Sequence, residues 1–441
     1  MASTLRSLIL FFLFNLFIYL VLFIPLKQYR RRLYVIIIIC YLLHLLLMVA
    51  MQFDFNRYPY RLKLTSFFFN DGELYELHAR PISAILTNKP LGYTSRLDVA
   101  TDWVSEWTWR GLVPPADTYQ VGYITYFYGI LYSIFGYSEL IIHLWNIVLH
   151  LLVGILIFQI SRTLFDDKTG YISTILFLFN PTLFYYATTK VAESSYIFLL
   201  CLIIFILLSI SKTRHNAVIN FLKLIILIGA LFAFYLLKEK LIFPLLISIL
   251  TYMIIAPVIY YKKLKWFLFF MLFFCVFYFQ KLLLFFNYLF HSLSTSHYNY
   301  LISGGQIYNL FKFESDFNNY TFIHKLLYIL FSWAHFIIEP ARYTTILYVL
   351  YYPYKLIFIA LSIFAFLGMV ISIKSRNLPS LLLIFYLFLM GTVIAGASGN
   401  AGTMLRHRDM VSFVIFIFAA FFIKNKISGS FTKNQASSRI K

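Results

Sequence analysis

The feature that most constrains this chain is a succession of apolar segments, each about 20 residues long, the length a helix needs to cross a hydrocarbon core of about 30 Å. We find eleven, at about 6–26, 33–51, 139–162, 170–188, 194–211, 217–237, 241–261, 265–285, 354–373, 378–397 and 409–424. Only 12% of the 441 residues are charged, against roughly a quarter in a soluble domain. The sequence therefore predicts an all-α polytopic membrane protein with about 11 transmembrane helices and excludes a soluble globule.

Basic residues mark every second connection between these segments. The connections concerned contain Arg30-Arg31-Arg32, Arg162 and Lys168, Lys212 and Arg214, Lys262-Lys263, Lys374 and Arg376, and the tail from Lys424. Nineteen of the 37 Lys and Arg residues fall on this side, but only two of the 17 acidic residues, Asp166 and Asp167. By the positive-inside rule we expect this side to be cytoplasmic, with the N-terminus outside and the C-terminus inside. Attraction to anionic lipid headgroups then accounts for the net charge of +20 without a nucleic acid partner.

The apolar segments divide the chain into six expected parts. These are two transmembrane helices in 1–51, an outer loop in 52–138, six transmembrane helices in 139–285, a second outer loop in 286–353, three transmembrane helices in 354–424 and a cytoplasmic polar tail in 425–441. Both outer loops are rich in aromatic residues, which argues against disorder. Tyr123 to Tyr137 is apolar but too short to span comfortably, so we expect an interfacial helix there.

The first outer loop contains a candidate catalytic acid. Asp71 opens a short amphipathic segment that includes Glu73 and Tyr75. A carboxylate in this position can accept a proton from a hydroxyl or hold a divalent metal ion. The structural alternative, compatible with either role, is that Asp71 caps the helix that follows it.

A second acid, Glu193, lies in a very short outer turn between two membrane helices. Charged groups at such depths are costly, so they indicate a functional site by default. The alternative is a local ion pair with Lys190, three residues earlier. Lys238 lies at the next outer connection, where its alternative role is to anchor a helix end among the headgroups.

A third group, Arg406-His407-Arg408, lies at the outer end of the last apolar segment. Guanidinium groups form bidentate, charge-assisted hydrogen bonds with phosphate. The positive-inside rule requires basic residues on the cytoplasmic side and not on this outer side. Basic residues here therefore favour a phosphate site over simple anchoring to lipid headgroups.

The cysteines and histidines give no metal-site motif. Cys40, Cys201 and Cys275 each lie inside an apolar run, and we expect them to behave as small apolar side chains. We expect His143, His150 and His335 to be packed or interfacial residues rather than metal ligands, because no HxxxH pattern and no Cys/His cluster is evident along the chain.

The order of these motifs resembles the GT-C glycosyltransferases, in particular bacterial relatives of the protein O-mannosyltransferases and of the lipid A aminoarabinose transferase. The resemblance covers about residues 33–425. It rests on Asp71, Tyr75 and Ala79 at D-x-x-x-Y-x-x-x-A spacing, Pro114-Pro115, Phe135-Gly136, Arg162, Asn180-Pro181, Glu193, Lys238 and Arg406-His407-Arg408. The chain departs from the family at Gly72, which replaces a second acid, while Glu73 stands one position later.

The resemblance implies a GT-C-like bundle that transfers a sugar from a polyprenyl-phosphate donor to a lipid, glycan or protein acceptor on the extracytoplasmic face of a bacterial cytoplasmic (inner) membrane. Asp71 would be the catalytic base or would hold a divalent metal ion, and Glu193 would position a substrate. Arg406 and Arg408, together with Lys190 and Lys238, would neutralise the departing lipid phosphate. Glu73, Tyr75 and His407 would complete the substrate-binding residues.

Two other classes remain as alternatives. A transporter or flippase of lipid-linked oligosaccharide needs ionisable residues along a path through the bilayer, and here most charges lie at the outer helix ends. An oligosaccharide polymerase or ligase would use the late arginines but would not require Asp71.

Overall fold

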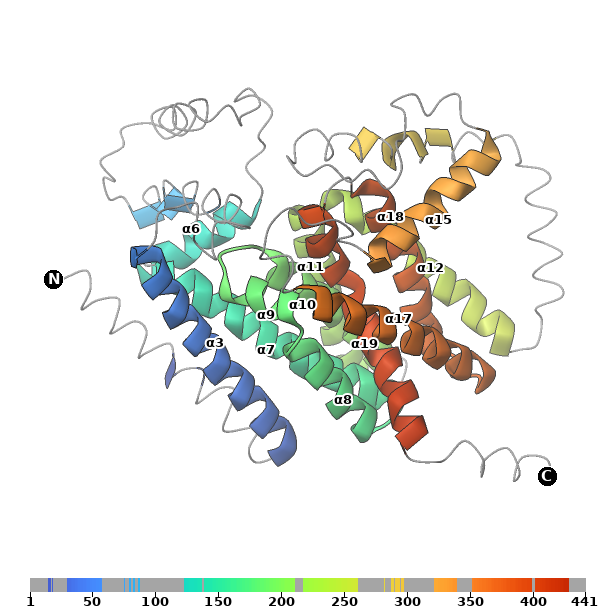
Figure 1. Ribbon diagram of the computed structural model, residues 1–441, viewed down its shortest axis with the longest axis horizontal. Coiled ribbons are helices and arrows are strands. Elements are labelled where there is room, and N and C mark those ends of the chain that lie inside the picture. The colour runs from blue at the N-terminus through green and yellow to red at the C-terminus, as the bar shows by residue number, and fades with distance from the viewer. Residues whose placement is uncertain are drawn as a thin grey trace. The chain divides into compact units, whose positions relative to one another are not determined.

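The computed structural model describes a helical protein, and Figure 1 shows its ribbon. The described residues are 15–16, 18, 30–57, 75, 79–80, 82–83, 86–87, 123–136, 139–210, 217–260, 281, 287–288, 290–293, 295–296, 321–338, 351–398 and 401–427. Within these residues all regular structure is helical and there is no strand, as the sequence predicts. Most of the first outer loop and the expected helix at 265–285 lie outside them, as does nearly all of the expected helix at 6–26.

The longer helices follow the chain in this order: α3 (Arg31–Arg57), α6 (Tyr123–Phe135), α7 (Glu139–Leu164), α8 (Asp167–Leu178), α9 (Pro181–Thr188), α10 (Glu193–Ile210), α11 (Ala217–Leu237), α12 (Glu239–Tyr260), α15 (Phe322–Ile338), α17 (Tyr351–Lys374), α18 (Ser380–Ala397) and α19 (Ala401–Ile427). Eight of them in the described part are long and apolar enough to cross a membrane. Each coincides with one of the eleven predicted segments, so the prediction of a multi-pass α-helical membrane protein is confirmed.

Helix α3 shows how these helices distribute their side chains. Beyond Arg31 and Arg32 in its first turn, which are also exposed, its exposed large residues are apolar: Val35, Ile39, Leu42, Leu43, Leu46 and Val49. Its buried face contains Leu33, Ile37, Tyr41 and Met48. It also contains Cys40 and His44, whose side chains can act as metal ligands. Water would oppose this arrangement and lipid favours it, because the apolar face can meet acyl chains while polar groups find partners inside the bundle.

The predicted helix at 170–188 is instead two helices, α8 and α9. Pro181 has no backbone N–H and cannot continue the hydrogen-bond ladder of α8. Asn180 begins α9 as its N-cap, and its side-chain oxygen accepts hydrogen bonds from the backbone N–H groups of Thr182 and Leu183, both at 3.1 Å. The sequence does show this break as Asn-Pro, but the apolar length of the segment hides it.

Two short apolar helices lie in the regions predicted as outer loops. Helix α6 confirms the helix expected at 123–137, and Gly136, with φ of 82°, follows its last residue in a conformation that favours glycine. Gly129 allows α6 to approach the earlier chain, since a Cβ there would lie 2.6 Å from Ile82 Cγ2. Helix α15 was not predicted, and it packs against α18.

The chain forms two compact units. The first comprises 1–155, 178–199 and 232–237, and the second comprises 156–177, 200–231 and 238–441. In the first unit, α3 packs against α9. In the second, α17 packs tightly against α19, because Gly368 leaves no room for a Cβ beside the Phe418 carbonyl.

Three of the predicted cytoplasmic connections meet at one end of the second unit. Lys424 Nζ forms an ion pair of 2.8 Å with Asp166 Oδ2. Asn377, between α17 and α18, donates a hydrogen bond of 2.7 Å to the carbonyl of Leu164, at the end of α7. The structure therefore groups the ends of α7, α17 and α19, as the alternating charge pattern requires.

Candidate functional site

The connection between α9 and α10 is the most unusual part of the first unit, because it is buried. Thr188, Thr189, Lys190 and Glu193 all have exposed fractions of 8% or less. Connections usually run over the surface, where water satisfies their backbone groups. A buried connection must find protein partners for those groups instead.

One face of α7 supplies part of these partners. His143, Asn146 and His150 recur at intervals of three and four residues, and all three are buried. His143 Nδ1 lies 2.6 Å from the carbonyl oxygen of Thr188, and His150 Nε2 lies 3.3 Å from that of Leu178. The polar face of this membrane helix thus follows the backbone of α9 and its flanking residues.

Asn146 and Tyr128 hold the middle of the connection. The Asn146 amide donates to the carbonyl oxygens of Thr189 at 2.7 Å and Val191 at 2.9 Å. The Tyr128 hydroxyl, from α6, lies 3.3 Å from the carbonyl oxygen of Lys190 and 3.4 Å from that of Val191. These contacts fix the backbone on both sides of Lys190.

Burial raises the pKa of the Tyr128 hydroxyl, and the nearby acidic groups of Tyr75 and Glu193 raise it further. A hydrogen bond from Asn146 acts in the opposite direction but does not cancel the shift. The phenol therefore remains protonated at neutral pH and serves as a hydrogen-bond donor. The Tyr75 ring meets the Tyr128 ring edge-on, with centroids 6.5 Å apart.

Three predicted site residues, Tyr75, Lys190 and Glu193, therefore lie around Tyr128. Glu193 is 1% exposed and is the first residue of α10. A carboxylate at that end of a helix is stabilised by the helix dipole. Asp71 and Glu73 lie outside the described residues, so their roles, including metal binding by Asp71, stay predictions.

The second unit contains the other predicted residues. His407 lies within electrostatic reach of Lys238 and Arg406, and the Ser398 hydroxyl lies 3.4 Å from His407 Nδ1. Lys238, Arg406 and His407 are all partly exposed. The structure thus brings together three predicted residues, two of them cationic, at the start of α19.

Arg408 points elsewhere. It is 2% exposed, its guanidinium carbon lies 4.0 Å from the centroid of the Phe358 ring, and its Nη1 donates to the carbonyl of Phe336 at 3.3 Å. Residues two apart on a helix face different directions. Helix α19 therefore does not direct Arg406 and Arg408 toward one shared phosphate. The sequence interpretation expected such sharing because it did not place both residues inside a helix.

Sequence reasoning did not assign Tyr128 or Asn146 to the site, and it expected His143 and His150 to be packed or interfacial residues. The signal was present in the spacing of His143, Asn146 and His150, which places polar groups on one face of an apolar helix. It expected Cys40 to behave as a small apolar side chain, and it did not single out His44, four residues later on α3. Together with His150 they form a cluster that the linear search for a metal motif could not detect.

Comparison with known proteins shows that residues 123–280 match the family model of dolichyl-phosphate-mannose-protein mannosyltransferases. The match supports a membrane glycosyltransferase of the GT-C type and confirms the resemblance inferred from the motifs. Searches of curated proteins and of solved structures gave no match.

The matched range covers about a third of the chain, from α6 to just beyond α12. It includes Tyr128, Asn146, Lys190, Glu193 and Lys238. Asp71 and the start of α19 fall outside it. The family match therefore covers the buried connection together with the side chains that hold it.

Proposed function

We propose that the protein transfers a sugar from a polyprenyl-phosphate donor to an acceptor hydroxyl or a lipid-linked glycan on the extracytoplasmic face of the membrane. The match of residues 123–280 to a family of lipid-phosphate-sugar-dependent transferases is the observation that carries this proposal. The buried connection between α9 and α10 lies within that range and supplies a pre-organised acid, Glu193.

In this proposal the acceptor hydroxyl attacks the anomeric carbon of the donor sugar, the bond from that carbon to the phosphate oxygen breaks, and polyprenyl phosphate leaves. Asp71 accepts the hydroxyl proton or holds a divalent metal ion that orients the acceptor. Glu193 positions a substrate sugar. The negative charge that develops on the leaving phosphate is the change that the enzyme must stabilise most.

The geometry around Glu193 supports a positioning role. Glu193 is the first residue of α10, and its carboxylate lies within electrostatic reach of the protonated hydroxyl of Tyr128. Asn146 and Tyr128 hold the backbone that leads to it. A side chain fixed in this way orients a bound sugar with little loss of its own conformational freedom.

Lys238, Arg406 and His407 support a phosphate site. Two positive charges close to an imidazole attract a lipid phosphate, and the guanidinium of Arg406 can form two parallel hydrogen bonds with it. Arg408 takes a different part in this proposal: its packing on Phe358 fixes the direction in which α19 presents Arg406.

The direct test uses purified protein, radiolabelled polyprenyl-phosphate sugars and membrane acceptors, and measures the release of polyprenyl phosphate. We expect release by the native chain and a strong decrease in Glu193→Gln. The matched control is Glu239→Gln, because Glu239 is exposed at the start of α12. Translocation of an intact lipid-linked sugar without release would contradict the transferase and support a flippase.

The proposed face is tested separately. Reporter fusions after Lys168, Lys265 and Arg376 should report the cytoplasm, and a cysteine placed at Asp98 should react with an impermeant reagent from outside. The opposite labelling pattern would overturn the orientation and, with it, the extracytoplasmic active site.

A further inference from the structure

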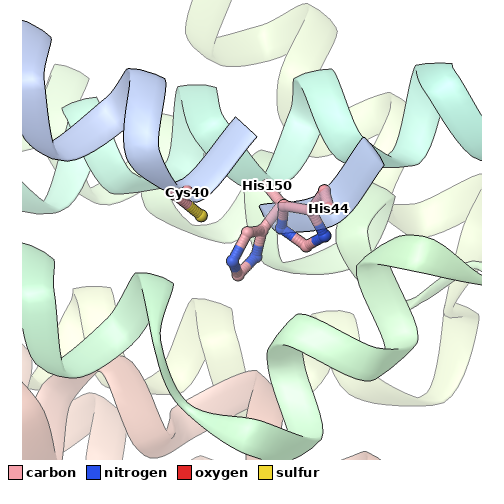
Figure 2. Close-up of side chains that lie close together, drawn as sticks. All are labelled: Cys40, His44 and His150. Carbon is pink, nitrogen blue, oxygen red and sulfur yellow. The ribbon is translucent and has the colours of Figure 1, made fainter. Parts of the chain in front are cut away.

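Cys40, His44 and His150 lie together inside the first unit. Cys40 and His44 are one helical turn apart on α3, and His150 comes from α7. Their ligand atoms all lie within 4.8 Å of one another, and none of the three residues is more than 2% exposed. Figure 2 shows the three side chains converging on one space from these two helices.

His44 presents a buried nitrogen that has no hydrogen-bond partner among the described residues. Its Nδ1 lies 2.8 Å from the Thr188 hydroxyl, whereas its Nε2 is inaccessible to solvent and unpaired. Leaving such a group unpaired inside a bundle costs about 1–3 kcal/mol. The His44 ring stacks on Phe184 with centroids 3.8 Å apart, and packing alone accounts for the position of the ring. Packing does not account for the burial of an Nε2 atom without a hydrogen-bond partner among the described residues.

The break between α8 and α9 leaves the carbonyl oxygen of Leu178 beside Cys40 and His150. Thr182 would bond to the Leu178 carbonyl in a continuous helix, but its N–H donates to Asn180 instead. The Leu178 oxygen lies 3.6 Å from Cys40 Sγ and 3.3 Å from His150 Nε2. One carbonyl thus faces two of the three potential ligands.

We propose that Cys40, His44 and His150 bind a soft d¹⁰ metal ion through one thiolate and two imidazoles. Sulfur and imidazole nitrogen are the donors that such ions prefer. Metal–ligand bonds of about 2.0–2.3 Å place the donors of a tetrahedral set roughly 3.5 Å apart. The cluster therefore needs a contraction of about 1 Å, within the reach of small side-chain rotations, and the Leu178 carbonyl stands close to the fourth position.

Charge favours Cu⁺ over Zn²⁺ at this depth. Binding releases the thiol proton of Cys40, so Cu⁺ with one thiolate and two neutral imidazoles carries no net charge. Zn²⁺ with the same ligands carries one positive charge, which is costly among lipid-facing helices. Both ions fit the donors, and their relative affinity tests this charge argument separately.

A bound metal would tie α3 to α7 and to the connection described above. His44 contacts Thr188 through its other nitrogen, and the carbonyl of Thr188 contacts His143. The ion would therefore fix the ring of His44 and, through Thr188, the beginning of the buried connection. This link concerns stability and positioning and does not depend on which sugar is transferred.

The test measures metal bound to the purified full-length chain after incubation with Zn²⁺, or with Cu⁺ under anaerobic reducing conditions, followed by removal of free metal. We expect one equivalent in the native protein and background levels in Cys40→Ser, His44→Gln and His150→Gln. Cys201→Ser and His335→Gln are matched controls outside the cluster, and both should retain the metal. Retention by Cys40→Ser, or loss in the controls, would contradict the site.

X-ray absorption on the metal-loaded native protein keeps the proposal testable if the variants fail to fold. It should show one sulfur and two imidazole nitrogens around the ion, and the metal should raise the melting temperature. A native protein that binds neither ion, or binds it through oxygen alone, would overturn the proposal and leave a purely structural polar cluster. Tighter binding of Zn²⁺ than of Cu⁺ would support the site and contradict the charge argument.

Discussion

The interiors of the two units use polar groups differently. In the first unit, side chains of α6 and α7 reach across to backbone carbonyls between Leu178 and Val191. In the second unit, the interior between α17, α18 and α19 is mainly aromatic and aliphatic, and Phe358, Tyr386 and Phe413 are fully buried there. Arg408 is the largest buried polar side chain in the described part of that interior.

The continuity of the helices, and with it the pairing of their backbone groups, explains this difference. Continuous helices such as α17 and α19 satisfy their own N–H and C=O groups, so their neighbours need to supply only packing. The broken region around α9 leaves carbonyls that need donors from elsewhere. Broken backbone inside a membrane protein is tolerated where it is buried in protein or lines a cavity, and the connection that follows α9 is buried in this way.

The largest expected effect comes from the acid assigned to chemistry. Asp71→Asn should reduce sugar transfer by about 10²–10⁴-fold, the usual cost of losing a general base. Turnover of radiolabelled donor at matched expression measures this effect. Asp98→Asn, in the same outer loop, is the control and should leave turnover unchanged. Near-normal turnover in Asp71→Asn would reduce Asp71 to a helix cap.

Asn146→Leu tests the bonded interior of the first unit. It removes the Asn146 donor from the carbonyls of Thr189 and Val191, and the Tyr128 hydroxyl remains near the Val191 oxygen. We expect a cost of about 1–3 kcal/mol for each oxygen left unpaired. Thermal unfolding in detergent measures the loss. Ser412→Ala is the control from the second unit, because its hydroxyl bonds to Asp409 within its own helix. Equal losses in the two variants would contradict the contrast between the interiors.

Arg408→Lys tests the aromatic interior of the second unit. The ammonium keeps the charge but loses the planar contact with Phe358 and a fixed donor to Phe336, so we expect a loss of about 2 kcal/mol in unfolding free energy. The exposed Arg32, replaced by Lys, is the control. Unchanged stability would show that this guanidinium is not held by its aromatic neighbours.

Arg406→Lys should weaken donor binding rather than stability. Loss of the bidentate fork should lower affinity for polyprenyl-phosphate sugar about tenfold, equivalent to about 1.4 kcal/mol. Equilibrium binding of the labelled donor measures the change. Full affinity in Arg406→Lys and also in Arg406→Ala would remove this residue from the phosphate site.

The smallest effect concerns the ion pair at the predicted cytoplasmic end. Burial alone would raise the pKa of Asp166, but hydrogen bonds and charge from Lys424, together with hydrogen bonds from Thr169, lower it overall. A lowered pKa contributes stability above the usual value of 3.8, and this is lost as pH falls through the folded-state pKa. Asp166→Asn should therefore cost less than about 1 kcal/mol at pH 7. The difference from the native protein should disappear in acid, and a constant difference would exclude the linkage.

The first unit was harder to predict than the second. Helices α17 and α18 and most of α19 follow from apolar length, because each is one continuous segment. The first turns of α19, from Ala401 to the predicted start at 409, were not predicted. Length alone also suggested one helix at 170–188, and only Asn180-Pro181 marked the break. The role of Tyr128 was not predictable, because its contacts with Lys190 and Val191 join residues about 60 positions apart.

The sequence by itself determined the membrane class and the order of the eight spans that the structure describes, because apolar length is a local property. The sidedness of the charged connections stays a prediction from loop charge. It also predicted Tyr75, Lys190 and Glu193 as site residues, and this assignment stays a prediction. Only the tertiary structure decided that they surround Tyr128, that Arg408 turns away from Arg406, and that Cys40 and His44 meet His150. These outcomes depend on which helix faces pack together, and in lipid that choice follows from pairing polar groups across helices rather than from the apolar pattern of any one of them.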